Sequence, residues 1–395
     1  MVATVTTTAN TLIIKVDTLS STVLPTDVAP DPSDGGAPKR RHGWRWLWVI
    51  AGVVIAGLIA SAFVYLPYYA YTPGSATDTE GAILVQGAES YPSEGEIDFT
   101  TVRIRRVTPL RALQAWLDPA IDVVSERAYL GNFSPSENKS FNLQLMGDSK
   151  ETAIYVALTT LGYDVEVSGG GAVVRQVSPD VPAASVLEAG DVIIAVNGAP
   201  VHLDGDLGPI LAEFQPGDQV TLTVERPVAG SADSGGIQEY ETLTLLVTLA
   251  AREDGSALIG ISPGTRDDVE FDFPIDVDID SGSVGGPSAG LAFTLGIIDA
   301  LTPGELTGGQ KVATTGTIRL DGTVGPVGGV KQKTVTVERA GATLFLVPAE
   351  EADAARAAAG EDSDLEIVAV EDVDDAIAAL AARGGNGADL VTSAA

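Results

Sequence analysis

The sequence predicts a multidomain α+β protein with one transmembrane helix near its amino terminus, and three observations lead to this prediction. The chain has 395 residues, enough for two or three domains that each bury a core of their own. An uncharged, largely apolar run of 20 residues, "WLWVIAGVVIAGLIASAFVY", occupies residues 46–65. Beyond it, segments with strand periodicity and segments with helical periodicity follow one another up to about residue 383.

The composition excludes several classes of partner and site. The chain has 54 acidic residues, 23 basic residues and a formal net charge of −31. Nucleic acid is therefore not expected as a partner, because phosphate binding requires a concentrated positive surface. Cysteine is absent, which excludes disulfides, thiolate metal sites and a cysteine nucleophile. Only two histidines are present, His42 and His202, so there are few candidates for a histidine base.

A tail and a membrane anchor are expected before the folded part. Residues 1–43 are rich in small and polar residues and predict a disordered cytoplasmic tail. Residues 44–68 predict a transmembrane helix, because about 20 apolar residues cross the hydrocarbon core of a bilayer. Basic residues precede this span, so we expect a single-pass protein of the cell membrane, with the amino terminus in the cytoplasm and the rest outside. Aromatic residues mark both ends of the span, as in membrane proteins: Trp44, Trp46, Trp48, Tyr65, Tyr68, Tyr69 and Tyr71.

A small mixed α/β region is expected at residues 72–164, next to the membrane. Residues 95–104 alternate as in a strand, and residues 109–117 and 149–163 have helical periodicity. No chemical motif is found in this region, so its predicted role is to connect the membrane helix to the domains that follow.

Residues 165–250 resemble a PDZ domain, which is β-rich. The resemblance rests on "GGGAVVRQVSPDVPAASVLEAGDVIIAVNGAPV" over residues 169–201 and on "FQPGDQVTLTVER" over residues 214–226. It implies that a glycine-rich loop binds a peptide carboxylate and that the following strand takes the peptide as an added strand. A domain that serves only as a spacer is the alternative. The residues implied in peptide binding are Gly169, Gly170, Gly171, Ala172, Val173 and Val174.

Residues 254–383 contain a candidate nucleophile, Ser288, in the stretch "GGPSAGLAF". A serine of this kind is also a frequent helix N-cap, so the motif alone does not decide its role. A nucleophilic serine needs a base, and burial can lower the pKa of a lysine far enough for it to serve. Lys311 is expected in a polar loop. Lys331 and Lys333 point about 200° apart on a helix, so only one of them can face the site.

Two segments of this region together resemble the proteolytic domain of Lon proteases. They are "GGPSAGLAF" and "TTGTIRLDGTVGPVGGVKQKTVTVERAGATLFLVP", the latter over residues 314–348. The resemblance implies a Ser-Lys dyad in which Ser288 is the nucleophile and Lys333 the base. It also implies that Thr315 orients the lysine, although a threonine with β propensity beside a turn is the plainer interpretation. With the expected anchor and PDZ domain, residues 46–383 resemble the membrane-anchored, PDZ-containing Lon-like serine proteases of bacteria.

Further expectations concern the oxyanion hole and small ligands. Backbone N–H groups at Gly286 and Ser288 are expected to stabilise an oxyanion, because glycine permits a close approach of the main chain. No metal or cofactor is expected: residues 275–280 alternate as in a strand with one polar face, and they lack the glycine and glutamate of a calcium loop. No nucleotide is expected either, because no segment satisfies the Walker A spacing.

The sequence thus predicts a membrane-anchored, ATP-independent serine endopeptidase that cleaves unfolded or flexible proteins. Its expected partners are protein or peptide substrates, which the PDZ domain binds or gates, and the lipid bilayer through residues 44–68. The resemblance to Lon proteases also implies a homo-oligomer, as a hexameric ring. The alternative is a membrane-tethered PDZ scaffold or sensor whose Lon-like domain is inactive. Residues 384–395 are expected to form a second disordered tail.

Overall fold

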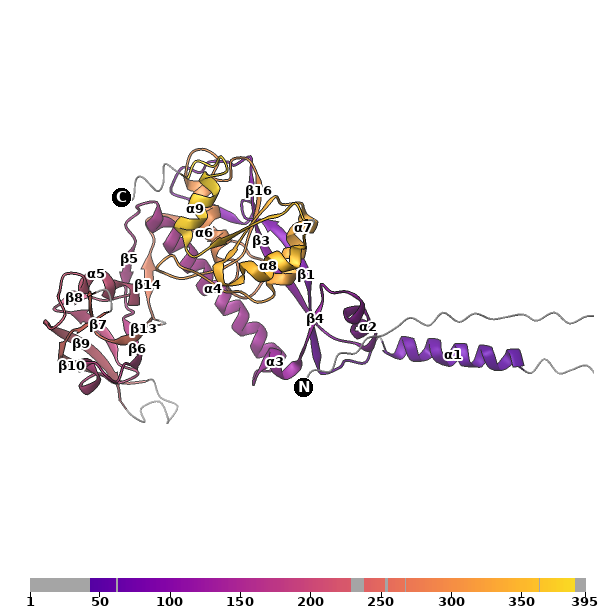
Figure 1. Ribbon diagram of the computed structural model, residues 1–395, viewed down its shortest axis with the longest axis horizontal. Coiled ribbons are helices and arrows are strands. Elements are labelled where there is room, and N and C mark those ends of the chain that lie inside the picture. Colours follow the sequence, from indigo (N-terminus) through magenta and orange to yellow (C-terminus); the bar gives the residue numbers. More distant parts are fainter. Residues whose placement is uncertain are drawn as a thin grey trace, which may run out of the picture. The chain divides into compact units, whose positions relative to one another are not determined.

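The computed structural model describes residues 43–61, 63–228, 238–252, 255–266, 268–361 and 363–387. The tails expected at residues 1–43 and 384–395 lie largely outside these ranges. The chain divides into two compact units, residues 1–56 and residues 57–395. The second unit contains both regions in which we expected a function (Figure 1).

Helix α1, Gly43–Ser61, lies where the membrane-spanning helix was expected. It has 19 residues and ends well before residue 68. In the part of the chain that the structure describes, no helix is both long and apolar enough to cross a membrane. The transmembrane helix expected at residues 44–68 is therefore not supported. Tyr68 and Tyr69, expected in an aromatic belt, instead begin a strand, and Tyr69 is buried against Tyr129 with 4.6 Å between the ring centroids.

A six-stranded mixed sheet forms the larger part of the second unit, with strand order β20-β19-β16-β3-β1-β4 (Figure 1). β3 pairs with β1 antiparallel and with β16 parallel. Residues 72–164 therefore do not form a separate region, because β1 and β3 belong to the same sheet as the strands of the last third. The strands are β1 (Tyr68–Asp78), β3 (Glu96–Arg106), β4 (Asp122–Ser125), β16 (Lys311–Thr314), β19 (Leu344–Pro348) and β20 (Glu366–Val370).

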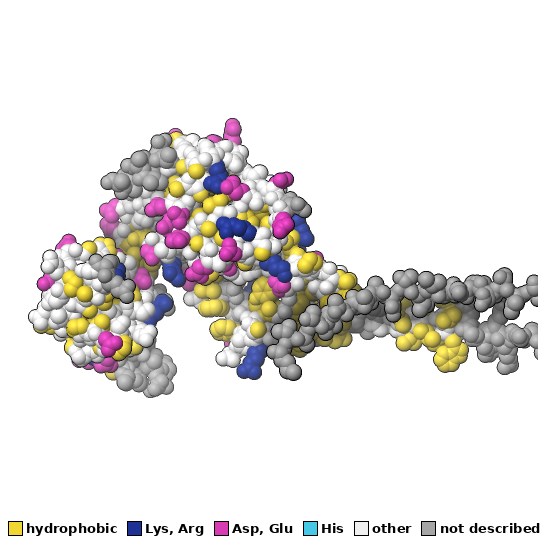
Figure 2. All heavy atoms as spheres, in the orientation of Figure 1, with side chains coloured by type: hydrophobic (Ala, Val, Ile, Leu, Met, Phe, Trp, Pro, Cys, Tyr) yellow, Lys and Arg dark blue, Asp and Glu magenta, His cyan; other side chains and the backbone are white. Residues whose placement is uncertain are grey.

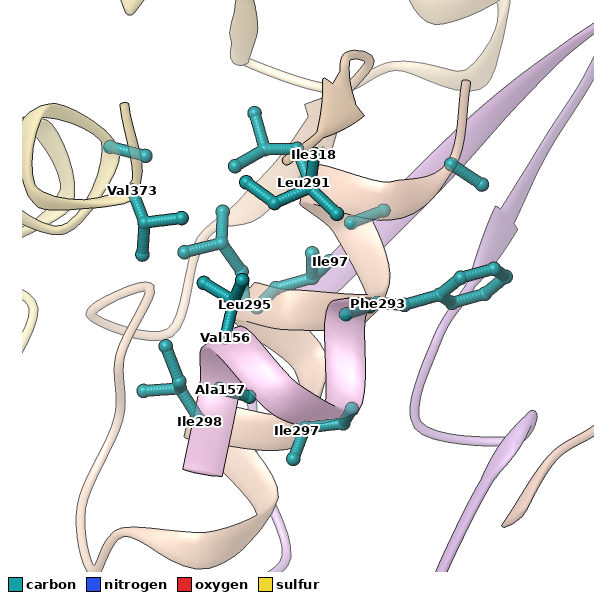
Figure 3. Close-up of a cluster of buried hydrophobic side chains, with 14 of the residues drawn as sticks. Ile97, Val156, Ala157, Leu291, Phe293, Leu295, Ile297, Ile298, Ile318 and Val373 are labelled. Carbon is teal, nitrogen blue, oxygen red and sulfur yellow. The ribbon is translucent and has the colours of Figure 1, made fainter. Parts of the chain in front are cut away.

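Helices cover both faces of this sheet because its strand residues alternate between two cores. On one face, Val312 and Leu344 pack with α4 (Pro135–Thr160), α6 (Gly290–Leu301) and α9 (Val373–Ala381). On the other face, Ala313 and Phe345 pack with α7 (Val330–Ala340) and α8 (Ala352–Ala359). α6 is almost wholly buried, and Figure 3 shows its apolar side chains beside Val156 and Ala157 of α4.

The smaller part of the second unit is a β-rich domain with strand order β10-β9-β7-β6-β13. Its core is a separate cluster of apolar residues that includes Val174, Ile193 and Leu222. Its elements are β6 (Ala172–Val177), β7 (Val192–Val196), β8 (Ala199–Pro200), α5 (Leu207–Leu211), β9 (Gln219–Pro227), β10 (Tyr240–Thr248) and β13 (Ile261–Thr265), with 3-10 turns η1 (Pro182–Ser185) and η2 (Asp204–Asp206).

Short strand pairs and two short helices complete the described elements. β15 (Asp276–Ile279) alternates between exposed and buried residues, so the strand expected at residues 275–280 is confirmed. The remaining elements are β2 (Ile83–Gln86), α2 (Pro109–Leu117), α3 (Glu126–Leu130), β5 (Glu166–Ser168), β11 (Ala250–Ala251), β12 (Ala257–Leu258), β14 (Glu270–Asp272), β17 (Thr317–Ile318), β18 (Val324–Gly325) and the 3-10 turn η4 (Ala349–Glu351).

Candidate active site

Ser288 lies in a tight turn immediately before α6. Gly286 has a φ of +90°, which a residue with a side chain rarely adopts, so glycine is required for the turn. The N-cap of α6 is Ala289, and no side chain caps this helix. Ser288 is therefore not used as a helix cap, and its hydroxyl is available for another interaction.

Helix α4 holds this turn in place. The N–H of Gly286 donates to the carbonyl of Asn142 at 2.7 Å, and the buried hydroxyl of Ser149 donates to the carbonyl of Pro287 at 3.1 Å. The expectation that Gly286 contributes to an oxyanion hole is therefore wrong, because its N–H already has an acceptor. Among the described residues the N–H of Ser288 has no such acceptor, and it stays a predicted oxyanion donor.

Sequence reasoning missed Asn142 because it began the helix at residue 149, and it gave no role to Ser149, the first residue of that helix. The structure begins α4 at Pro135, with Ser134 as its N-cap and Glu137 completing a capping box. The pattern Ser-Pro-x-Glu is a recognisable helix start, so it could have revealed this longer helix.

Lys333 comes from α7, on the opposite face of the sheet from α6. α7 begins after Gly329, whose φ of +74° turns the chain into the helix. Lys333 is 1% exposed, whereas Lys331 is partly exposed and forms an ion pair with Asp122 at 2.8 Å. The expectation that the two lysines point in different directions is confirmed, and Lys333 is the buried one.

Ser288, Lys333 and Thr315 meet beyond the end of β16. The Nζ atom of Lys333 lies 2.8 Å from the Oγ atom of Ser288 and 2.8 Å from the Oγ1 atom of Thr315. Thr315 directly follows β16, is buried, and donates its hydroxyl hydrogen to the carbonyl of Ser288 at 3.2 Å. Because β16 ends at Thr314, no strand separates the helices of the two faces at this point, and their side chains can touch.

Burial lowers the pKa of Lys333 from 10.5 to about 7, because a charged ammonium group is poorly solvated there. The negative charge of Glu351 acts in the opposite direction and raises this pKa. Glu351 is fixed by the N–H of Val327, which donates to its carboxylate at 2.8 Å. Burial in turn raises the pKa of Glu351. A lysine with a pKa near neutrality can exchange a proton with a serine at physiological pH.

The other candidate bases lie elsewhere. Lys311 was expected in a polar loop but lies in β16, where it pairs with Glu96 and with the buried Asp98. The hydrogen bond to Glu96 raises the pKa of Lys311, which therefore stays charged. His202 lies in the β-rich domain, where its Nδ1 atom is 3.0 Å from the carbonyl oxygen of Gly169.

A cleft of about 650 Å³ opens beside Ser288. β3 forms one wall: β16 pairs with it only as far as Phe99, and β1 covers its other edge. The backbone of residues 100–104 therefore has no strand on the side that faces Ser288. Besides Ser288 and this part of β3, the lining includes Tyr129, Asn138, Asn142 and Met146.

The peptide-binding residues expected in the β-rich domain are not free to bind a peptide. β6 pairs with β7 on one side and with β13 on the other, so no edge of Ala172, Val173 or Val174 is open. In the preceding loop, the N–H of Gly170 donates to Asp268 and the N–H of Gly171 to the carbonyl of His202. The assignment of peptide binding to residues 169–174 is therefore wrong.

β13 is the strand at this edge of the sheet. It pairs only with β6 among the described strands, from Ile261 opposite Val177 to Thr265 opposite Ala172. The sequence analysis ended this domain at residue 250 and so missed the strand that covers β6. The open strand edge belongs to residues 261–265.

Two protein families match the chain. Residues 263–383 match the Lon protease (S16) C-terminal proteolytic domain, and residues 159–243 match the PDZ domain. The resemblances drawn from the sequence are thus confirmed for these two domains.

Curated relatives match part of the chain. The chain is 33% identical over 188 residues to the Lon protease of Methylocella silvestris, and the aligned region covers 47% of this chain and 21% of the relative. The chain is also 33% identical over 160 residues to the Lon protease of Malacoplasma penetrans, and this aligned region covers 40% of this chain and 18% of the relative. The chain thus spans about a fifth of the length of these relatives.

A solved structure is also similar to part of the chain. The PDZ domain of an SdrC-like protein from Listeria monocytogenes is 26% identical and covers 25% of this chain and 92% of its own, with a TM-score of 0.21.

Proposed function

We propose that this chain, which carries a PDZ domain and a Lon-type proteolytic domain, is a serine endopeptidase with a Ser288-Lys333 dyad. The observation that carries the proposal is the 2.8 Å contact between the Nζ atom of Lys333 and the Oγ atom of Ser288 in a buried setting. The nucleophile, a base with a pKa of about 7 and a cleft beside them occur together.

In the first step, the neutral amine of Lys333 takes the proton of the Ser288 hydroxyl as the Oγ atom attacks the peptide carbonyl. Thr315 accepts a hydrogen bond from the lysine at 2.8 Å and so aims its amine at the serine. The N–H of Ser288 faces the developing oxyanion, next to the amino-terminal end of α6, whose dipole favours negative charge.

In the second step, Lys333 returns the proton to the departing amine and the acyl-enzyme forms. Water then attacks the ester, with Lys333 again taking a proton, and Ser288 is released with its hydroxyl restored. Each proton taken is given back within one cycle, so the reaction requires water and no cofactor.

The substrate we propose is an extended polypeptide. Residues 100–104 of β3 present an unpaired backbone edge along the cleft that contains Ser288. An extended chain can pair with this edge. A folded domain cannot, because it does not fit into the cleft. The 395 residues contain no Walker A motif, so we propose cleavage without ATP of proteins that are already unfolded or flexible.

We assign peptide docking in the PDZ domain to the edge of β13. A ligand strand pairing with Ile261–Thr265 would extend the sheet beyond its last strand. Amide chemical shifts test this assignment: when a peptide binds, the amide signals of Ile261, Ser262, Gly264 and Thr265 should shift more than those of residues 172–177. If residues 172–177 shifted more, peptide binding would instead be assigned to β6. Assembly into a hexameric ring and the location of the catalytic domain stay predictions.

A serine-reactive fluorophosphonate probe tests the proposed function. The protein should be labelled at Ser288, and the Ser288→Ala variant should not be labelled. The parent protein should also cleave an unfolded protein, and the Ser288→Ala variant should not. A protein that binds peptides but neither reacts with the probe nor cleaves would be a PDZ scaffold, and the enzyme assignment would be wrong.

A further inference from the structure

Helix α2, Pro109–Leu117, turns its large apolar side chains away from the protein. None of its nine residues is buried. Arg111, Ala112 and Ala115 are partly covered, while the large residues on the other side of the helix are exposed. Those residues are Leu110, Leu113, Trp116 and Leu117, with Trp116 at 81% and Leu117 at 68% exposure. A helix on the surface of a soluble domain normally has the reverse arrangement.

Packing of α2 against the other described residues therefore does not explain why this helix is stable. A nine-residue helix is marginal on its own, since most helical stability in proteins comes from burying an apolar face. The start of α2 is nevertheless well defined, with Thr108 accepting from the N–H of Arg111 and Pro109 in the first turn. The chain thus builds a defined helix whose apolar face has no cover among the described residues.

A second apolar segment lies next to the start of α2. Phe63, Val64 and Tyr65 are all exposed, Phe63 by 77%. The N–H of Leu66 donates to the carbonyl of Val107 at 2.8 Å, which places this segment directly before α2 in space. Together, residues 63–65 and the apolar face of α2 form what we call the apolar patch.

Basic residues lie beside the apolar patch in a chain that is otherwise strongly acidic. Figure 2 shows acidic side chains spread over the face of the molecule that it presents. Residues 103–127, in contrast, contain five arginines and three acidic residues. Arg106 lies 6.0 Å from the ring of Tyr65, and Arg111 donates to the carbonyl of Arg106. Two of the three acidic side chains are engaged, Glu126 with Arg106 and Asp122 with Lys331.

We propose that the apolar patch docks on the surface of a lipid bilayer with anionic headgroups. Leucine and tryptophan on one face of a short helix, with arginines beside them, is the arrangement of helices that lie in the membrane interface. Tryptophan and tyrosine suit this boundary because each has an apolar body and a polar tip. The arginines supply the complementary charge for anionic lipids. This proposal rests on residues 63–65 and 106–117, independently of any spanning segment.

The absence of cysteine allows a local test in the full-length protein. A single cysteine at Leu113→Cys, labelled with a polarity-sensitive fluorophore, reports on the apolar patch. Leu246→Cys is the matched control, because Leu246 is similarly exposed (58% against 52%) but lies on β10 of the PDZ domain. Neither substitution removes a buried side chain, so both variants should fold.

With vesicles of phosphatidylcholine and phosphatidylglycerol, the label at position 113 should shift to the blue and be quenched by spin-labelled lipid, and the label at 246 should not. In an Arg106→Gln, Arg111→Gln background, more phosphatidylglycerol should be needed for the same shift, because these two arginines lie at the apolar patch. An equal shift on pure phosphatidylcholine would overturn the role of charge. A shift that follows protein concentration without vesicles would mean that a second copy covers the patch. No shift in either setting would also refute the proposal.

Discussion

The amine of Lys333 lies 2.8 Å from the hydroxyl of Ser288, although the two residues are 45 positions apart. Ser288 lies in the turn before α6 and Lys333 lies in α7, and these two helices are on opposite faces of a sheet. The contact is made where β16 ends, beside a cleft whose other wall comes from residues 100–104. The proposed nucleophile, the proposed base and the proposed substrate-binding edge thus come from three separate stretches of the chain. This relationship leads to four predictions.

Removing either member of the pair should abolish cleavage. We expect Ser288→Ala and Lys333→Ala each to lower kcat/KM by about 10⁴-fold or more, because residues that act as one unit lose nearly all their effect together. Cleavage of a fluorescently labelled unfolded protein measures this. Lys331→Ala is the matched control: Lys331 is in the same helix but partly exposed and paired with Asp122, so activity should stay near that of the parent. A Lys333→Ala variant as active as the control would exclude the dyad.

Thr315 should affect the rate of the chemical step more than substrate binding. Thr315→Val keeps the shape of the side chain but loses the hydroxyl that contacts Lys333 and the carbonyl of Ser288. We expect kcat to fall by about tenfold to hundredfold, since hydrogen bonds to charged groups contribute about 1.5 to 3 kcal/mol, with little change in KM.

Thr315→Ser is the control for this prediction, because it restores a hydroxyl at the same position. If Thr315→Ser were as impaired as Thr315→Val, the exact fit of the side chain, and not the hydroxyl alone, would be the important part. Thr315 would then be a packing residue beside the turn, as its β propensity alone indicates.

The pair itself was predictable from the sequence, but the cleft was not. "GGPSAGLAF" made Ser288 a candidate, helix geometry left one of Lys331 and Lys333 as its partner, and the resemblance to Lon proteases chose Lys333. Residues 100–104, Asn142 and Ser149 have no such signature. They act through a backbone edge and through hydrogen bonds to carbonyls, which many residue types provide equally well, and only the pairing of distant strands brings them to the site.

The fold was predictable to a similar extent. Periodicity predicted several elements, such as the strand at residues 95–104 and the helix at residues 109–117, but it does not specify which strands are neighbours. β3 and β16 are separated by the whole PDZ domain in sequence and are parallel neighbours in the sheet. In the same way, β13 lies after the predicted end of the PDZ domain and covers the strand to which peptide binding was assigned. Both errors concern long-range pairing, which local patterns do not encode.

Activity should depend on pH through Lys333. Because the neutral amine is the base, kcat/KM should rise with pH around the pKa of about 7 and level off above it. Glu351→Gln removes the negative charge that raises this pKa while keeping an acceptor for Val327, so the midpoint should move to lower pH. Asp353→Asn, which changes a fully exposed carboxylate close by, should leave the midpoint unchanged. A Glu351→Gln profile that shifts to higher pH would contradict this electrostatic role.

Burial of Lys333 should lower the free energy of unfolding, by an amount that depends on pH. Its pKa is about 7 in the folded protein and 10.5 when unperturbed, so the unfolded chain binds more protons between these values and stability rises with pH across this window. Lys333→Met removes the charge, and we expect a gain of about 1 to 4 kcal/mol at neutral pH that shrinks towards alkaline pH. Urea unfolding across the window measures this. Lys331→Met, in the same helix but partly exposed, should not change the pH dependence, and an equal effect of both substitutions would refute the burial argument.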